Sequence, residues 1–213
     1  MKKIATLIIT LALYTSSYSQ SANKISIDLN LARYARTPVL FGADNYLNEF
    51  TYFNGFNISY TPAKNLSYFV GLRRVNTSID SGGGFTHETS DIQGLEFRTG
   101  VKFSSKRDKR VFLTYGLELF GEFSTIQGTY WVDYPPTYEI NHRKNYVGFA
   151  PSLEIGIRVI DNIILFAETR YRFGMVNLIQ IESTQMDKEL FSNQKYWLSL
   201  FEPLNSIGVR FNY

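Results

Sequence analysis

The side chains most suited to catalysis are few in this sequence. There are two histidines and no cysteine; His87 stands in the run His87-Glu88-Thr89-Ser90, and His142 follows Glu139 by three residues. A lipid hydrolase or acyltransferase would need a histidine close to a serine and an acid. The spacing around His87 matches no such motif. We therefore predict that both histidines are solvated loop residues and that the chain has no enzymatic activity.

No metal or cofactor site is expected. With two histidines in separate regions and no cysteine, any metal site would depend on carboxylates. The glycine-rich stretch at 80–84 lacks the lysine of a phosphate-binding loop and opens no helix. The formal net charge is +3 and falls to +1 if Lys2 and Lys3 leave with a signal peptide, so there is no electrostatic basis for binding nucleic acid.

Charged residues of both signs share one face of the last five predicted segments, from 92–103 to the C-terminus. Arginine dominates among the cations, and its guanidinium group forms fixed bidentate pairs with carboxylates. Buried charges must be paired, so these residues are predicted to interlock inside a lumen. The predicted lumen network consists of Glu96, Arg98, Glu118, Glu154, Arg158, Glu168, Arg170, Arg172 and Arg210.

The elements that carry these charges have the period of β-strands. In the stretch 92–103, Leu95, Phe97 and Val101 alternate with Glu96 and Arg98. Seven other segments alternate in the same way. The predicted strands are 25–31, 53–60, 66–75, 92–103, 111–123, 147–159, 163–173 and 206–213.

The connections between these segments alternate in length. Short turns are predicted at 61–65, 104–110 and 160–162, whereas 35–52, 77–91, 124–145 and 174–195 are predicted to be long loops. Eight strands running up and down would place the short turns and both termini at one end, as transmembrane β-barrels do. The predicted fold class is all-β, a closed antiparallel up-and-down barrel.

The first nineteen residues have the pattern of a secretory signal peptide. Lys2 and Lys3 precede an apolar run at 4–14, and Ser17 and Ser19 offer the small residues that a signal peptidase reads. The run is too short for the ~20 residues of a transmembrane helix. The predicted division is a signal peptide at 1–19 and one barrel domain at 20–213.

The alternation alone permits two opposite barrels. A soluble barrel carrying an apolar ligand would turn its Leu, Ile and Phe face inward, whereas a membrane barrel turns that face to lipid. The paired charges favour the membrane barrel, and so do aromatic residues near strand ends, which would form girdles at the lipid–water interfaces. These aromatics are Tyr52, Phe53, Tyr60, Tyr146, Tyr171, Phe173, Tyr196, Trp197 and Tyr213.

The last eight residues also favour the membrane. Ser206 and Gly208 are followed by Phe211 and the terminal Tyr213, a pattern that resembles the C-terminal assembly signal of outer-membrane β-barrels. Together with the signal peptide and the alternation, it makes the whole mature chain resemble the small, eight-stranded outer-membrane β-barrel family of Gram-negative cells. This resemblance implies a location in the outer membrane, contact with its lipid, and recognition by the barrel assembly machinery.

Charge also suggests a strand register. Like charges directly opposite each other are destabilising, so Glu154 is expected opposite Arg170 rather than Glu168. By the same reasoning, Arg98 is expected opposite Glu118.

The function expected from these features is non-enzymatic: a barrel with a charge-filled lumen whose long outward loops serve envelope structure or surface binding. Eight strands leave an interior that side chains can fill. The best candidate for a binding surface is the aromatic set Tyr130, Trp131, Tyr134 and Tyr138 in the third long loop, although self-packing against the rim would explain it equally. A lipid-modifying enzyme and a soluble periplasmic barrel are the alternatives.

Overall fold

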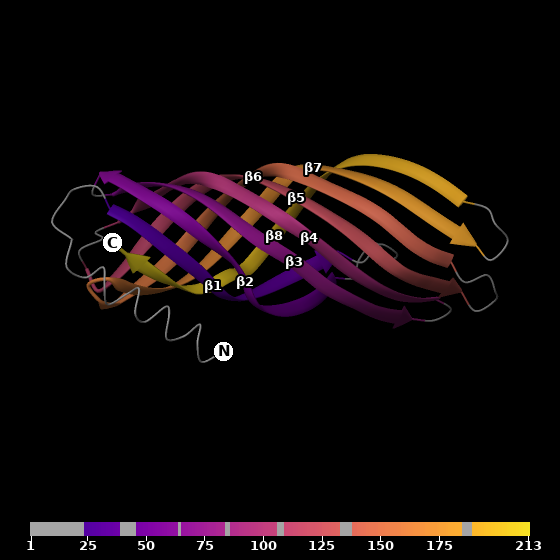
Figure 1. Ribbon diagram of the computed structural model, residues 1–213, viewed down its shortest axis with the longest axis horizontal. Helices are drawn as coiled ribbons and strands as arrows, with labels where there is room; N and C mark the ends of the chain where they lie inside the picture. The colour runs from indigo at the N-terminus through magenta and orange to yellow at the C-terminus, as the bar shows by residue number, and fades with distance from the viewer. Residues whose placement is uncertain are drawn as a thin grey trace.

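The chain folds into a closed barrel of eight antiparallel strands, shown in Figure 1. The computed structural model describes residues 24–38, 46–63, 65–83, 86–105, 109–132, 138–184 and 189–213, and the predicted signal peptide lies outside them. The strands are β1 (Lys24–Pro38), β2 (Tyr46–Ala63), β3 (Leu66–Gly83), β4 (Thr86–Ser104), β5 (Val111–Val132), β6 (Tyr138–Ile160), β7 (Ile163–Thr184) and β8 (Glu189–Asn212). Each strand pairs with the next, and β1 pairs with β8 to close the ring. The predicted fold class is confirmed.

The outer surface near the short turns is a belt of large apolar side chains. On β5, Leu117 and Leu119 are 53% and 62% exposed, while Thr114 and Glu118 on the opposite face are buried. Soluble proteins rarely expose apolar patches of such extent, because water solvates them poorly. The apolar faces therefore point outward, as predicted, and the soluble barrel with an apolar interior is excluded.

The strands are much longer than the sequence pattern predicted. Most of each predicted long loop is strand, and only positions 39–45, 84–85, 133–137 and 185–188 separate the strands at that end of the barrel. The prediction of long outward loops is therefore wrong. In place of loops the barrel wall itself continues, and we call this part beyond the apolar belt the extension.

The extension has the opposite polarity from the belt. Its interior contains an apolar cluster, in which Val75, Ile92, Ile126 and Ile140 are buried and Tyr130 packs against them. Its outer face is mostly polar and exposed, with Arg74, Asn76, Asp91, Gln93, Thr125, Gln127, Thr129, Asn141 and Arg143, although Phe191 of β8 is also 69% exposed there. Apolar-in and polar-out is the pattern of a barrel in water, so the extension is built for an aqueous environment.

The wall is not equally high all the way round. Pairing of β2 with β3 ends at Gly55 and Arg73, although β3 continues to Gly83 in pairing with β4. Figure 1 shows β4 to β8 reaching well beyond the ends of β1 and β2. The β1–β2 hairpin thus separates from β3 above Arg73.

A bulge marks the level at which the hairpin separates. The β1–β2 register shifts between Asn30 and Ala32, and on the facing strand Phe53 has a φ of 48°, in the left-handed region that bulky residues rarely adopt. The bulge leaves Tyr52 and Phe53 both exposed, at 71% and 75%.

Among the described residues there is no helix long and apolar enough to cross a bilayer.

Candidate functional site

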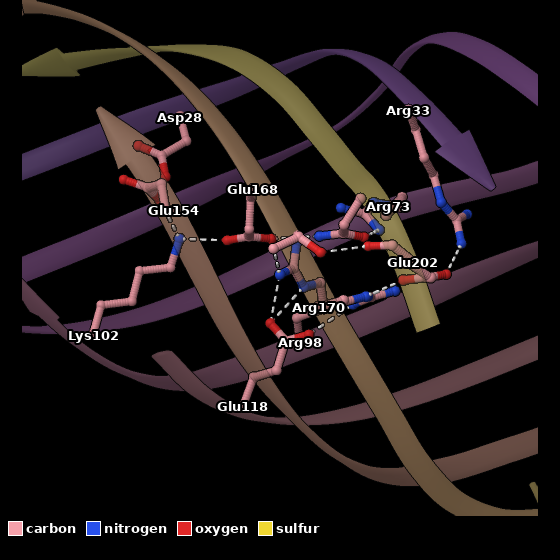
Figure 2. A network of polar contacts seen from close by, with 12 residues as sticks. Asp28, Arg33, Arg73, Arg98, Lys102, Glu118, Glu154, Glu168, Arg170 and Glu202 are labelled. Carbon is pink, nitrogen blue, oxygen red and sulfur yellow. Dashed lines mark hydrogen bonds and ion pairs between the residues drawn. The ribbon is translucent and has the colours of Figure 1, made fainter. Parts of the chain in front are cut away.

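The lumen within the apolar belt is filled by a cross-linked set of ion pairs, drawn in Figure 2. Eight of the nine predicted members are at most 3% exposed, and these are Glu96, Arg98, Glu118, Glu154, Glu168, Arg170, Arg172 and Arg210. The ninth, Arg158, is only half-buried and lies near the end of β6, beside the short turn at 161–162.

Toward the short turns, Arg210 of β8 holds two carboxylates at once. Its guanidinium group donates to both oxygens of Glu154 at 2.8 Å and to both oxygens of Asp28 at 2.7 and 3.0 Å. Lys102 Nζ donates to Glu154 and to Glu168, each at 2.7 Å. This part of the network therefore ties β1, β4, β6, β7 and β8 together.

In the middle of the lumen two arginines share the carboxylates of several strands. Arg98 donates to Glu118 from Nε at 2.9 Å and to Glu168 from Nη2 at 2.8 Å. Arg170 donates to Glu118 at 2.7 Å, to Glu96 at 2.8 Å and to Glu202. Charge-assisted bonds of this kind are about twice as strong as neutral ones, so the centre of the barrel is rigidly connected.

Above this layer the network meets aromatic rings. Arg172 donates to Glu122 at 2.8 Å, and Lys144 donates to the other oxygen of Glu122 at 2.9 Å. The Arg172 guanidinium carbon lies 4.3 and 4.4 Å from the ring centroids of Phe120 and Tyr146, within the range of cation–π attraction. Tyr146 is fully buried, which corrects its predicted place in an interfacial girdle.

The predicted register is wrong at both points. Glu154 lies directly opposite Glu168, and Arg98 lies opposite Phe120, which leaves Gly100 opposite Glu118. The like charges of Glu154 and Glu168 are tolerated because Lys102 crosses the lumen from β4 and binds both carboxylates. Arg98 still reaches Glu118 diagonally. The ion pair therefore forms although the two residues are not directly opposite each other on neighbouring strands, as was predicted.

Several members of the network were not predicted. They are Asp28, Arg33, Arg73, Lys102, Glu122, Lys144, Glu202 and Asn205. Asp28, Arg73 and Lys102 share the polar faces of their predicted strands, which was a usable signal. Glu202 and Asn205 lie where the β7–β8 register shifts between Glu168 and Arg170, so the alternation that would have placed them is broken.

The predicted aromatic binding surface is not a loop. Tyr130 and Trp131 belong to β5 and Tyr138 begins β6, while Tyr134 lies outside the described residues. Tyr130 and Tyr138 pair across the two strands with ring centroids 6.2 Å apart. Since Tyr130 also packs against the apolar cluster of the extension, it contributes to internal packing.

Both histidines lie on strands, which corrects their predicted place in loops. His87 on β4 contacts Thr89 at 3.3 Å. His142 on β6 is fully buried, and its Nδ1 accepts a hydrogen bond from the Ile181 amide at 3.2 Å. Burial lowers the pKa of His142 in the extension because it disfavours the charged imidazolium. Within the described part of the chain, no group of three or more His, Asp or Glu side chains is arranged to hold a metal ion.

The barrel matches solved structures at low sequence identity. A major outer membrane protein from Thermus thermophilus superposes with a TM-score of 0.53 and 11% identity, over 91% of this chain and 100% of that one. The fold is that of an outer-membrane β-barrel. Acinetobacter baumannii CarO2 gives a TM-score of 0.47 at 9% identity, over 89% of this chain and 98% of that one. The attachment invasion locus protein Ail of Yersinia pestis gives 0.43 at 12%, over 91% and 100%. No family model matches the sequence, and no curated protein matches it.

The last residues of the outer-membrane β-barrel close its seam. Ser206 and Gly208 face the lumen, while Phe211 and Tyr213 are partly exposed. The Tyr213 amide donates to the Ile25 carbonyl at 2.8 Å. Tyr213, the residue after β8, therefore adds a hydrogen bond to the closure between β8 and β1.

Proposed function

We propose that this chain is a non-enzymatic protein of the outer membrane, a closed barrel that carries a rigid extension on the cell surface for envelope structure or surface binding. The observation that carries the proposal is the obstruction of the lumen. Eight strands enclose a space that side chains can fill, and here ion pairs occupy it within the apolar belt.

A second obstruction lies above the ion pairs. Phe120, Tyr146, Ala150, Val176 and Leu178 form a buried apolar cluster, and Leu198 packs against it. Solutes crossing the barrel would have to displace both layers. Buried ion pairs held at several points are costly to break, at about 3 to 5 kcal/mol for each partner removed, so free diffusion through the lumen is not supported.

The two ends of the barrel suit the two sides of an outer membrane. Short turns such as 161–162 lie at one end with the C-terminus, and the extension lies at the other. Outer-membrane barrels place their short turns in the periplasm and their larger parts outside. The polar outer face of the extension then faces the surroundings of the cell and is available to a partner. Lipid contacts the belt, and the C-terminal strand is read by the assembly machinery during insertion.

Cysteine labelling on whole cells tests this placement, because the natural chain has no cysteine. Gln127 and Leu117 lie on the same strand and point outward, one on the extension and one on the belt. A membrane-impermeant maleimide is expected to label Gln127→Cys on intact cells and to leave Leu117→Cys unlabelled. Ser105→Cys, exposed at a short turn, is expected to react only after the outer membrane is permeabilised.

Reaction of Ser105→Cys but not Gln127→Cys on intact cells would reverse the topology, and recovery of the protein in the periplasmic extract would reject the membrane location. Conductance of the purified protein in planar bilayers tests the closed lumen. We expect no stable open level, and porin-like steps would show that the ion pairs do not seal it.

A further inference from the structure

The extension has a free strand edge on β8. This strand pairs with β7 from Glu189 onward, but its pairing with β1 begins only at Leu204, opposite Tyr34. The stretch 189–203 therefore has a strand on one side, and none of the described strands lies on the other. Figure 1 shows β8 continuing well beyond the end of β1.

Side-chain exposure also marks this stretch as an edge. On β5, inside the wall, Ile126 is 2% exposed and lies between exposed neighbours. On β8, by contrast, every residue at 193–197 is exposed, with Tyr196 on the inner face at 39% and Trp197 on the outer face at 68%. Both faces of the strand, as well as its open side, are thus accessible to a partner.

The backbone of such an edge needs hydrogen-bond partners. Alternate residues of a strand direct their N–H and C=O groups to opposite sides, so about half of those at 191–197 point away from β7. Water can satisfy these groups one by one, whereas an added strand satisfies the whole row. A proline would remove a donor, but the single proline of β8 is Pro203, near the base of the free stretch. The edge above Pro203 is therefore open to pairing.

The side chains beside the edge indicate which kind of strand fits. Phe191 and Trp197 point outward and are 69% and 68% exposed, and exposed Lys195 lies between them. Cross-strand pairs between apolar side chains, and between opposite charges, are favourable. A matching strand would therefore place apolar residues beside the two rings and an acidic residue beside Lys195.

We propose that the free edge of β8 at 191–197 binds an extended segment of a partner polypeptide, which adds to the sheet as an antiparallel strand. Main-chain hydrogen bonds then provide affinity, and alternate side chains provide specificity. Such binding is one form of the proposed surface binding and rests on it for the source of the partner.

A second copy in the same membrane fits this edge less well. Two barrels inserted in one membrane point the same way, so their β8 strands run in the same sense across the bilayer. They cannot lie beside each other as antiparallel neighbours, and parallel pairing is less stable per residue. A separate polypeptide is free to approach in the antiparallel direction.

A synthetic peptide tests the edge on the wild-type barrel purified in detergent. The probe is the fluorescently labelled nonapeptide Thr-Val-Thr-Glu-Thr-Asn-Thr-Val-Thr. In the antiparallel register, its valines lie opposite Phe191 and Trp197 and its glutamate lies opposite Lys195. Saturable binding is expected in fluorescence anisotropy. Absence of saturation up to about 1 mM peptide would reject the edge as a binding site.

Backbone N-methylation separates strand addition from simple adhesion to apolar side chains. Two versions of the probe carry N-methyl groups at alternate residues, one at the even positions and the other at the odd positions. Only one of these sets has its N–H groups facing β8. That version is expected to lose at least about tenfold in affinity, while the other binds nearly as the parent does. Equal affinities of the two versions would overturn strand addition.

A charge reversal tests the register. Lys195→Glu is expected to weaken binding of the probe about threefold to tenfold, and a probe with lysine in place of its glutamate should restore the affinity. Arg143→Glu, on the outer face of β6 between two paired strands, changes the net charge equally and should leave both affinities unchanged. The same response from both variants would reject the edge as the docking site.

Peptide binding is measured without cells, so its result is separate from the placement of the extension. Labelling of Gln127→Cys on intact cells together with no peptide binding would reject strand addition and leave the proposed placement intact. Peptide binding with the reversed labelling pattern would keep the edge and reject the placement. A dimer of the purified barrel that the probe dissociates, detected by light scattering, would make a second copy the occupant and overturn the proposed partner.

Discussion

Substitution of Lys102 gives the strongest test of whether ion pairs across the lumen stabilise the barrel. Lys102 is 3% exposed and joins two glutamates that lie directly opposite each other on β6 and β7, with both contacts at 2.7 Å. Lys102→Met keeps the apolar stem but removes both bonds and the charge that separates Glu154 from Glu168.

The expected loss of stability follows from the hydrogen bonds that Glu154 and Glu168 keep in the variant. Glu154 keeps two hydrogen bonds from Arg210, and Glu168 keeps its hydrogen bonds from Arg98 and Asn205. Neither carboxylate is therefore left without a hydrogen-bond donor. Two opposed anions are left with less compensation in a buried site, and breaking such a pair costs about 3 to 5 kcal/mol. We expect the free energy of unfolding to fall by about that amount.

Urea unfolding in detergent micelles, followed by fluorescence, measures this free energy. The double variant Lys102→Met/Glu168→Gln should regain part of the loss, because it removes one of the opposed charges. Lys195→Met on an exposed position of β8 is the control and should change stability by less than about 0.5 kcal/mol. If Lys102→Met cost under about 1 kcal/mol, with an unchanged dependence on urea, the claim that cross-lumen pairing makes the register tolerable would fail.

Three further predictions concern the belt, the terminus and the extension. Leu117→Arg should destabilise the barrel in bilayers by about 2 to 4 kcal/mol, and a neutral effect on bilayer folding would contradict the outward orientation. Deletion of 211–213 should leave the protein degraded or periplasmic, which fractionation would detect; normal outer-membrane levels would contradict the assembly role. His142 has a lowered pKa, so the unfolded chain binds its proton first as the pH falls below about 6.5 and stability of the extension declines there. Hydrogen exchange at the Ile181 amide, corrected for its intrinsic rate, should accelerate at pH 5, and His142→Gln should abolish that pH dependence.

The fold could be predicted because lipid and strand pairing impose a simple rule. A strand within the belt must place apolar residues outward, so Leu113, Leu117 and Leu119 of β5 alternate without interruption. The extension was missed because its apolar residues change face. On β5 the exposed apolar residues of the belt are odd-numbered, whereas the residues that pack in the apolar cluster beyond it are even-numbered Ile126 and Tyr130. A period-two pattern that changes phase looks like the end of a strand.

The ion-pair network was predictable in part of its composition but not in its connections. Glu96, Arg98 and Arg170 share a face, and burial forces such charges to pair. Which carboxylate each arginine binds depends on reach across a narrow lumen, as in the contact of Lys102 on β4 with Glu154 on β6. Sequence separation and neighbouring-strand rules carry no information about contacts across a cylinder.

These contacts across the cylinder also have a mechanical meaning. Arg98 on β4 holds Glu168 on β7, Arg170 on β7 returns to Glu96 on β4, and Arg73 on β3 holds Asn205 on β8 at 2.7 Å. Each contact joins strands on opposite sides of the barrel. Lateral pressure in a membrane that would flatten an empty barrel into an ellipse must here stretch or break several of these cross-lumen contacts together. The barrel should therefore keep its round section in membranes whose lateral tension differs.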